Sequence, residues 1–174
     1  GAPVEAGVVV LPDVRSPAEF EAWLPQARGK FVMVSMAQPT CRPDDNWREF
    51  AADTVQFNQM RARRAEMQQR WNQRVRSTTG DSTPAIANRT IPSRLAAAGP
   101  RGLFTHNWSQ GWGVDKIFNA RFGQTIPSID LSCEDSGLVF RPAEHGQNPV
   151  VRVHADAQDL GEVPVANVIA QIRG

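Results

Sequence analysis

Apolar runs and helical stripes alternate along the chain and predict a mixed α/β domain. Runs of strand length, which apolar periodicity identifies as covered or half-covered strands, lie at residues 7–11, 30–35, 102–105, 126–132, 150–155 and 165–174. Helical patterns lie between most of them, at residues 16–29, 47–76, 92–98 and 134–146. Such alternation is typical of a mixed sheet flanked by helices. The run at 150–155 alternates strictly, which indicates an exposed antiparallel strand.

Two prolines affect the predicted helices in opposite ways. Ser16 suits an N-cap, Pro17 suits the first helical position, and Glu19 completes a capping box, so a helix should begin here. Pro142 lies inside the last helical pattern instead. Because proline lacks a backbone N–H, it predicts a kink or an early stop at that position.

Residues 47–76 have the longest helical pattern, which we interpret as an insertion upon the α/β core. Arg64 interrupts its apolar stripe, which consists of Phe50, Phe57, Met60, Met67, Trp71 and Val75. Other arginines make the segment basic: Arg61, Arg63, Arg70, Arg74 and Arg76. Such a helix can dock on a membrane or an acidic partner, or pack by one face on its own domain. We favour packing. Residues 77–90 have the composition of a loop.

Composition and charge argue against two classes of partner. The chain has 174 residues, with 19 basic and 18 acidic side chains and a formal net charge of +1. A dedicated nucleic-acid binder normally has a clear basic excess, so nucleic acid is not an expected partner. No apolar run approaches the roughly 20 residues that a bilayer-spanning helix needs, and a membrane is also an unfavoured partner.

No segment has a complete catalytic or metal-binding motif. The sequence lacks a Gly-x-Ser-x-Gly elbow, a pair of histidines four residues apart, and a glycine-rich turn before Lys-Ser or Lys-Thr. Its histidines, His106, His145 and His154, are scattered. We therefore expect no catalytic residue, no metal ligand and no cofactor within this chain.

The polar-aromatic stretch at residues 106–116 is the strongest candidate for a binding surface. Trp108 and Trp112 offer flat apolar faces beside the charged pair Asp115 and Lys116. Tryptophan is enriched at recognition hot spots. These four residues define one hypothesis, a self-standing module that binds a peptide or a glycan. The alternative is that both indoles fold back over the core.

Several segments resemble the protease-associated domain family. The general pattern of that family is similar to residues 29–34, 95–104 and 126–131. Longer blocks, at residues 39–47, 112–118 and 131–135, resemble the protease-associated insert of secreted bacterial zinc peptidases of the M28 family. Residues 165–174 resemble the strand that re-enters the catalytic domain in that group.

This resemblance implies a domain organisation and a role. Residues 1–160 would form a protease-associated domain, with a helical insertion at about 47–76 and a loop at about 77–90. Residues 161–174 would be a connector and a strand leading into a catalytic domain outside this chain. Zinc and its ligands would belong to that domain, an aminopeptidase or carboxypeptidase. The chain itself would be a non-catalytic accessory domain that affects substrate access, with the catalytic domain and a peptide or protein substrate as partners. The implied location is extracytoplasmic, periplasmic or secreted.

The two cysteines, Cys41 and Cys133, each follow a predicted strand. Strands of like direction place their carboxyl ends on one edge of a sheet, so the cysteines would face each other there. A disulfide requires a Cα separation of roughly 5.5 Å, which this placement allows, and an extracytoplasmic location would preserve the bond. We therefore predict a disulfide. The alternative is two separate buried thiols, since cysteine is commonly buried.

Overall fold

The computed structural model describes residues 2–81, 83–107, 126–156 and 170–171. Its strands are β1 (Val4–Val10), β2 (Phe31–Met33), β3 (Gly102–Thr105), β4 (Ser128–Asp130) and β5 (Val150–Val153). Its helices are α1 (Pro17–Trp23), a short 3-10 helix η1 (Leu24–Ala27), α2 (Asp44–Phe50), α3 (Thr54–Thr79), α4 (Pro84–Ala98) and α5 (Cys133–Glu144). The fold is mixed α/β, as the alternation of patterns predicts.

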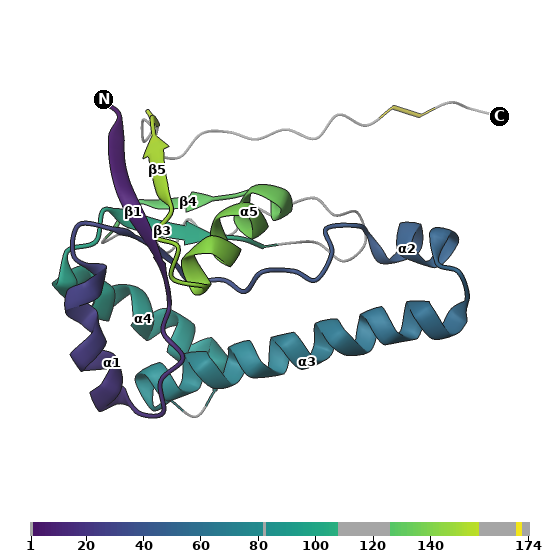
Figure 1. Ribbon diagram of the computed structural model, residues 1–174, viewed down its shortest axis with the longest axis horizontal. Helices are drawn as coiled ribbons and strands as arrows, with labels where there is room; N and C mark the ends of the chain where they lie inside the picture. Colours follow the sequence, from purple (N-terminus) through teal and green to yellow (C-terminus); the bar gives the residue numbers. More distant parts are fainter. Residues whose placement is uncertain (1, 82, 108–125, 157–169, 172–174) are drawn as a thin grey trace.

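These strands form one sheet in the order β4-β3-β2-β1-β5 (Figure 1). Neighbours from β4 to β1 are parallel, whereas β5 is antiparallel to β1. Strand β1 serves two partners, because Val4 to Gly7 pair with β5 and Val8 to Val10 pair with β2. It therefore begins three residues before the apolar run at 7–11. Its first two residues are exposed, and the apolar pattern does not mark them.

The helices pack on this sheet in two groups. Helices α1, α3 and α4 contact one another and lie below the strands in Figure 1. Helix α5 lies higher in the same view and packs against β1. The core between them contains the fully buried side chains of Phe20, Val32 and Leu103, among others.

Helix α1 begins where the capping signature predicts. The Ser16 hydroxyl accepts a hydrogen bond from the backbone N–H of Glu19 at 3.3 Å, and Pro17 is the first helical residue. The Glu19 carboxylate accepts from the backbone N–H of Arg15 at 3.0 Å, one residue before the cap. The hydrogen bond of the Glu19 side chain therefore goes to the residue before the cap instead of to the cap itself. Phe20 is fully buried, as the helical stripe requires.

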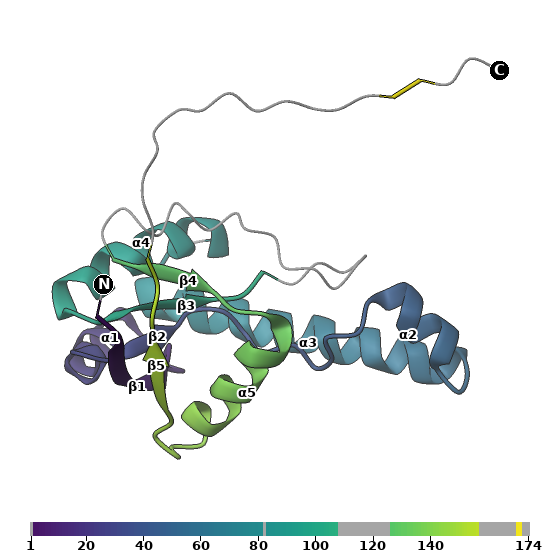
Figure 2. The same ribbon diagram turned by 90° about the horizontal axis from the view of Figure 1, so that it is seen from above.

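The predicted insertion at 47–76 is two helices rather than one. Helix α2 ends at Phe50, and Asp53 caps α3 by accepting from the backbone N–H of Gln56 at 2.7 Å. Helix α3 then continues to Thr79, where Gly80 takes the left-handed conformation with φ of 76°. Figures 1 and 2 show the first half of α3 extending beyond the sheet, with α2 beside its far end.

The predicted loop at 77–90 is wrong, because helix α3 occupies its start and helix α4 its end. The predicted short helix at 92–98 is the second half of α4. Ala87, Ile91 and Leu95 are buried at four-residue spacing, a stripe that Pro92 and its polar neighbours obscured. Near the start of α4, hydrogen bonding from Thr90 and, secondly, Thr79 holds the pKa of Asp81 below its ordinary value.

The last helix also differs slightly from its prediction. Helix α5 has Ser132 as its cap, which accepts from the backbone N–H of Asp135 at 3.1 Å. Pro142 lies in its last turn, and the helix ends two residues later at Glu144, before Gly146. Strand β5 follows, with exposure that alternates along Val150–Val153 as predicted for an antiparallel strand.

Helix α3 contributes to two separate apolar clusters. Trp71 and Val75 belong to the main core, whereas the buried Phe57 and Met60 lie outside it. Between the two pairs, Arg64 forms an ion pair with Asp44 of α2. Their side chains are only 12% and 11% exposed, respectively. Arg64 therefore interrupts the apolar stripe because it holds α2 on α3.

Cys41 and Cys133 form a disulfide with a Cα separation of 5.5 Å and a sequence separation of 92 residues. Cys41 follows β2, and Cys133 is the first residue of α5, just after β4. Because β2, β3 and β4 are parallel, the two cysteines lie at the same sheet edge. The bond closes a loop that contains α2, α3, α4, β3 and β4.

The Asp44–Arg64 pair gives a testable prediction about stability. Replacing Arg64 by Met removes the cation beside a nearly buried carboxylate, which should lower the free energy of unfolding by about 3 kcal/mol. Urea unfolding measures the loss. Arg63→Met, at an exposed neighbouring position, is the matched control and should change it by at most about 0.5 kcal/mol. The double variant Asp44→Leu/Arg64→Met should recover most of the loss. Equal effects of the two single arginine variants would contradict this role.

The disulfide gives a second prediction. Before reduction, denatured protein should offer no alkylatable thiol; after reduction it should offer two. On the chain-entropy model, opening a 92-residue loop should lower the free energy of unfolding by about 4 to 5 kcal/mol. Denaturant unfolding of the Cys41→Ser/Cys133→Ser variant measures this loss. Two reactive thiols in the unreduced protein would refute the bond.

Candidate functional site

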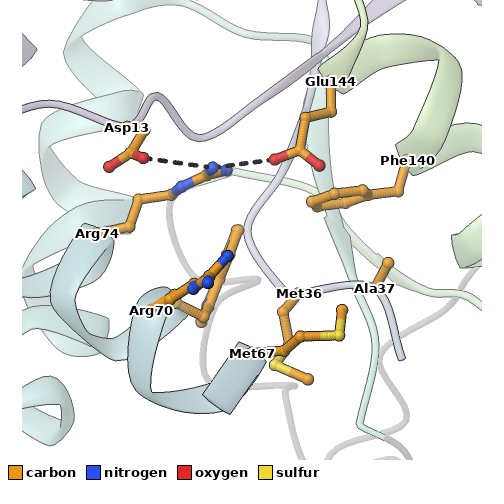
Figure 3. A pocket seen from close by; sticks show the side chains of 9 residues that line it. Asp13, Met36, Ala37, Met67, Arg70, Arg74, Phe140 and Glu144 are labelled. Atoms are coloured by element: carbon orange, nitrogen blue, oxygen red, sulfur yellow. Dashed lines mark hydrogen bonds and ion pairs between the residues drawn. The ribbon is translucent and has the colours of Figure 1, made fainter. Parts of the chain in front are cut away.

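A pocket with a volume of about 250 Å³ opens between α3 and α5, at the carboxyl edge of β1 and β2 (Figure 3). Ligands of open α/β sheets commonly bind at this edge. Asp13 follows β1, and Met36 and Ala37 follow β2. The complete lining is Asp13, Met36, Ala37, Met67, Arg70, Trp71, Arg74, Phe140 and Glu144.

The inner walls of the pocket are apolar. Met36, Trp71 and Phe140 are buried, and the rings of Trp71 and Phe140 lie 6.1 Å apart, tilted by 59°. Met36 and Met67 both line the pocket with their thioethers (Figure 3). Methionine adapts its shape to a neighbour and makes favourable contacts with aromatic rings. These walls are suited to one apolar side chain.

Arg74 is a fixed part of the rim. Its guanidinium donates to the Glu144 carboxylate at 2.9 Å and to the Leu11 carbonyl at 3.3 Å, and lies 3.9 Å from the Asp13 carboxylate. It also lies over the ring of Trp71, 5.2 Å from the ring centroid. The Arg74 side chain is 16% exposed. These contacts join α3 to α5 and to the segment after β1, and the one guanidinium balances the charges of two carboxylates.

Arg70 is the exposed cation of the same rim. Its side chain is 77% exposed, and it forms an ion pair with Glu66, one turn earlier on α3. Exposed pairs at this helical spacing stabilise by only about 0.3–0.5 kcal/mol. Arg70 can therefore leave Glu66 at small cost, whereas Arg74 cannot leave its partners.

A second polar cluster lies farther along the sheet edge, at the ends of β2, β3 and β4. The Thr105 hydroxyl donates to the Asp130 carboxylate, and the Ser35 hydroxyl accepts from the backbone N–H of His106 at 3.1 Å. Thr105 and His106 are buried. These bonds hold the three strand ends together, next to the segment in which the Trp108 stretch begins.

The residues predicted as sites have different outcomes. Trp108, Trp112, Asp115 and Lys116 lie outside the described residues, as does most of the strand expected at 165–174. Cys41 and Cys133 are bonded. Their bond joins the segment that follows Ala37 to helix α5, which carries Phe140 and Glu144. It therefore fixes two walls of the pocket relative to each other.

The sequence predicts the helix that forms one wall of this pocket, but not the pocket. Met67, Trp71, Arg70 and Arg74 were part of the predicted amphipathic helix, but Asp13, Met36 and Glu144 received no role. A usable signal existed for Asp13 and Met36, because both directly follow predicted parallel strands. No local sequence signal marks Glu144, because its partner Arg74 is 70 residues away.

The described residues and the comparisons with known proteins assign no family or function to this chain. Among the described residues, no group of three or more His, Cys, Asp or Glu side chains is placed to hold a metal ion. No helix in the described part of the chain is long and apolar enough to cross a membrane. The chain matches no protein-family model, no curated protein and no solved structure. A functional proposal therefore depends on the residues and the geometry.

The unequal roles of the two rim arginines can be measured. Arg74→Gln loses charge-assisted hydrogen bonds in a half-buried network, so its free energy of unfolding should fall by about 2 kcal/mol. Arg70→Gln removes one exposed pair and should change it by at most about 0.5 kcal/mol. Thermal or urea unfolding of both variants checks the difference. A loss at Arg70 equal to that at Arg74 would contradict the assignment.

Proposed function

We propose that this chain is a non-catalytic protease-associated domain of an M28-type zinc exopeptidase, where it affects substrate access and docking. One observation carries the proposal. The segments at 29–34, 95–104 and 126–131, which resemble that family, contain β2, β3 and β4, and these are adjacent parallel strands. Their register places Phe31 opposite Gly102 and Leu103 opposite Ser128.

The cysteines add support from a different part of the chain. Cys41 and Cys133 come from the two blocks, 39–47 and 131–135, that resemble the M28 insert more closely, and they are bonded to each other. A disulfide persists in oxidising compartments and is rare in the cytosol. The proposed location is therefore extracytoplasmic, periplasmic or secreted.

In this proposal the catalytic domain and this chain have different roles. Zinc and its general base belong to the catalytic domain, and this chain supplies no reacting group. Its contribution is to hold a substrate or product beside the active-site cleft, where positioning lowers the entropic cost of reaction. The pocket between α3 and α5 suits this task because it combines an apolar interior with a charged rim.

The proposal predicts the behaviour of the purified chain. After dialysis against a weak chelator and readdition of zinc, the chain should retain far less than one equivalent by elemental analysis. It should hydrolyse neither L-leucine p-nitroanilide nor dipeptides above the rate of buffer. Stoichiometric zinc together with hydrolysis would overturn the accessory role. Glycan binding that perturbs only tryptophan indole signals would favour the alternative module built on Trp108 and Trp112.

A further inference from the structure

We propose that the pocket between α3 and α5 binds one apolar amino-acid residue by its side chain and its free α-carboxylate, with Arg70 as the partner of the carboxylate. This inference deepens the accessory role proposed above and rests on it for the source of the ligand. An exopeptidase handles two such species, a peptide with an apolar carboxyl-terminal residue and a free apolar amino acid.

The size of the pocket limits the ligand to one residue. Sites for drug-sized molecules have volumes of about 300–1,000 Å³, and this pocket has about 250 Å³. The buried side chains of Met36, Trp71 and Phe140 form its interior. They offer dispersion contacts and no charge, so the inserted group is an apolar side chain.

The rim then selects the charged group beside that side chain. Glu144 and Asp13 both lie against Arg74, at 2.9 and 3.9 Å. Arg74 is itself held by the Leu11 carbonyl and stacked on Trp71. Glu144 can bind another cation only by giving up its hydrogen bond to Arg74, whereas the Asp13 carboxylate is 77% exposed and lies at the long end of ion-pair distance from Arg74.

Arg70 differs because its ion-pair partner, Glu66, is not part of the pocket lining. Since the exposed Arg70–Glu66 pair is weak, an anion inside the pocket can replace Glu66. A guanidinium binds a carboxylate through two parallel hydrogen bonds. Arg70 is therefore the cation of this rim that a ligand can engage, and the ligand group that it recognises is a carboxylate.

The four methionines of the chain provide a direct assay. Met36 and Met67 line the pocket, whereas Met33 and Met60 do not. With methyl-¹³C methionine labelling, millimolar N-acetyl-L-leucine should shift the methyl signals of Met36 and Met67 and leave that of Met60 unchanged. N-acetyl-L-leucinamide, which has the same side chain but no carboxylate, should bind about tenfold more weakly, since it lacks one charge-assisted interaction.

Two matched variants test the role of Arg70. Arg70→Gln should abolish the affinity difference between the acid and the amide, because its side chain has no charge. Arg63→Gln makes the same change at an exposed position of α3 outside the pocket lining and should retain the difference. Folding of both variants is checked by the unshifted methyl signal of Met33, which is buried in the main core.

The outcomes separate the parts of the proposal. Equal affinity of acid and amide for the native chain would overturn the carboxylate assignment. Absence of any shift at Met36 and Met67 would overturn the site. Tighter binding of L-leucine than of N-acetyl-L-leucine would support a free amino acid as ligand, and tighter binding of Ala-Ala-Leu a peptide terminus. Neither failure bears on zinc retention or hydrolysis, which test the accessory role separately.

Discussion

The disulfide between Cys41 and Cys133 constrains the part of the molecule on which the pocket depends. It links the chain leaving β2 to the first residue of α5, across the end of the intervening strand β3. Met36 and Ala37 lie just before one cysteine, and Phe140 and Glu144 lie about two and about three helical turns beyond the other. Noncovalent contacts of Arg74 then add the third wall, from α3. The pocket is thus framed by a covalent bond at one end and an ion-pair network at the other.

Helix α3 joins two regions of different stability. Its second half packs Trp71 and Val75 into the main core, while its first half contacts α2 through Arg48 over the Phe57 ring and through the Asp44–Arg64 pair. Regions with few core contacts open at a lower free energy than the whole protein. The far end of α3 and α2 therefore form a unit that can open while the sheet and the pocket remain intact.

Local signals predicted the fold well where they acted alone. The Ser16 cap and the alternation at Val150–Val153 depend on rules that neighbouring residues satisfy. The shared sheet edge of Cys41 and Cys133 follows from the common direction of the strands before them. The errors occurred where tertiary contacts override the local pattern. Pairing with β5 extends β1 back to Val4, and burial of Ala87, Ile91 and Leu95 carries α4 through Pro92. The pocket was missed for the same reason, since it joins residues from three distant segments.

The pairing of β1 with β5 has a consequence for how such a domain can be combined with another. Val4 lies opposite Val153, so the first residue of β1 and the last residue of β5 are adjacent on neighbouring antiparallel strands. Paired residues of such strands have Cα atoms about 5 Å apart. A domain with adjacent chain ends can be inserted into a surface turn of another protein, because the two ends of that turn need hardly move apart. Each of the two domains would then keep its own core. This strand pair thus has Val4 and Val153 at the opposite end of β1 from the pocket residue Asp13.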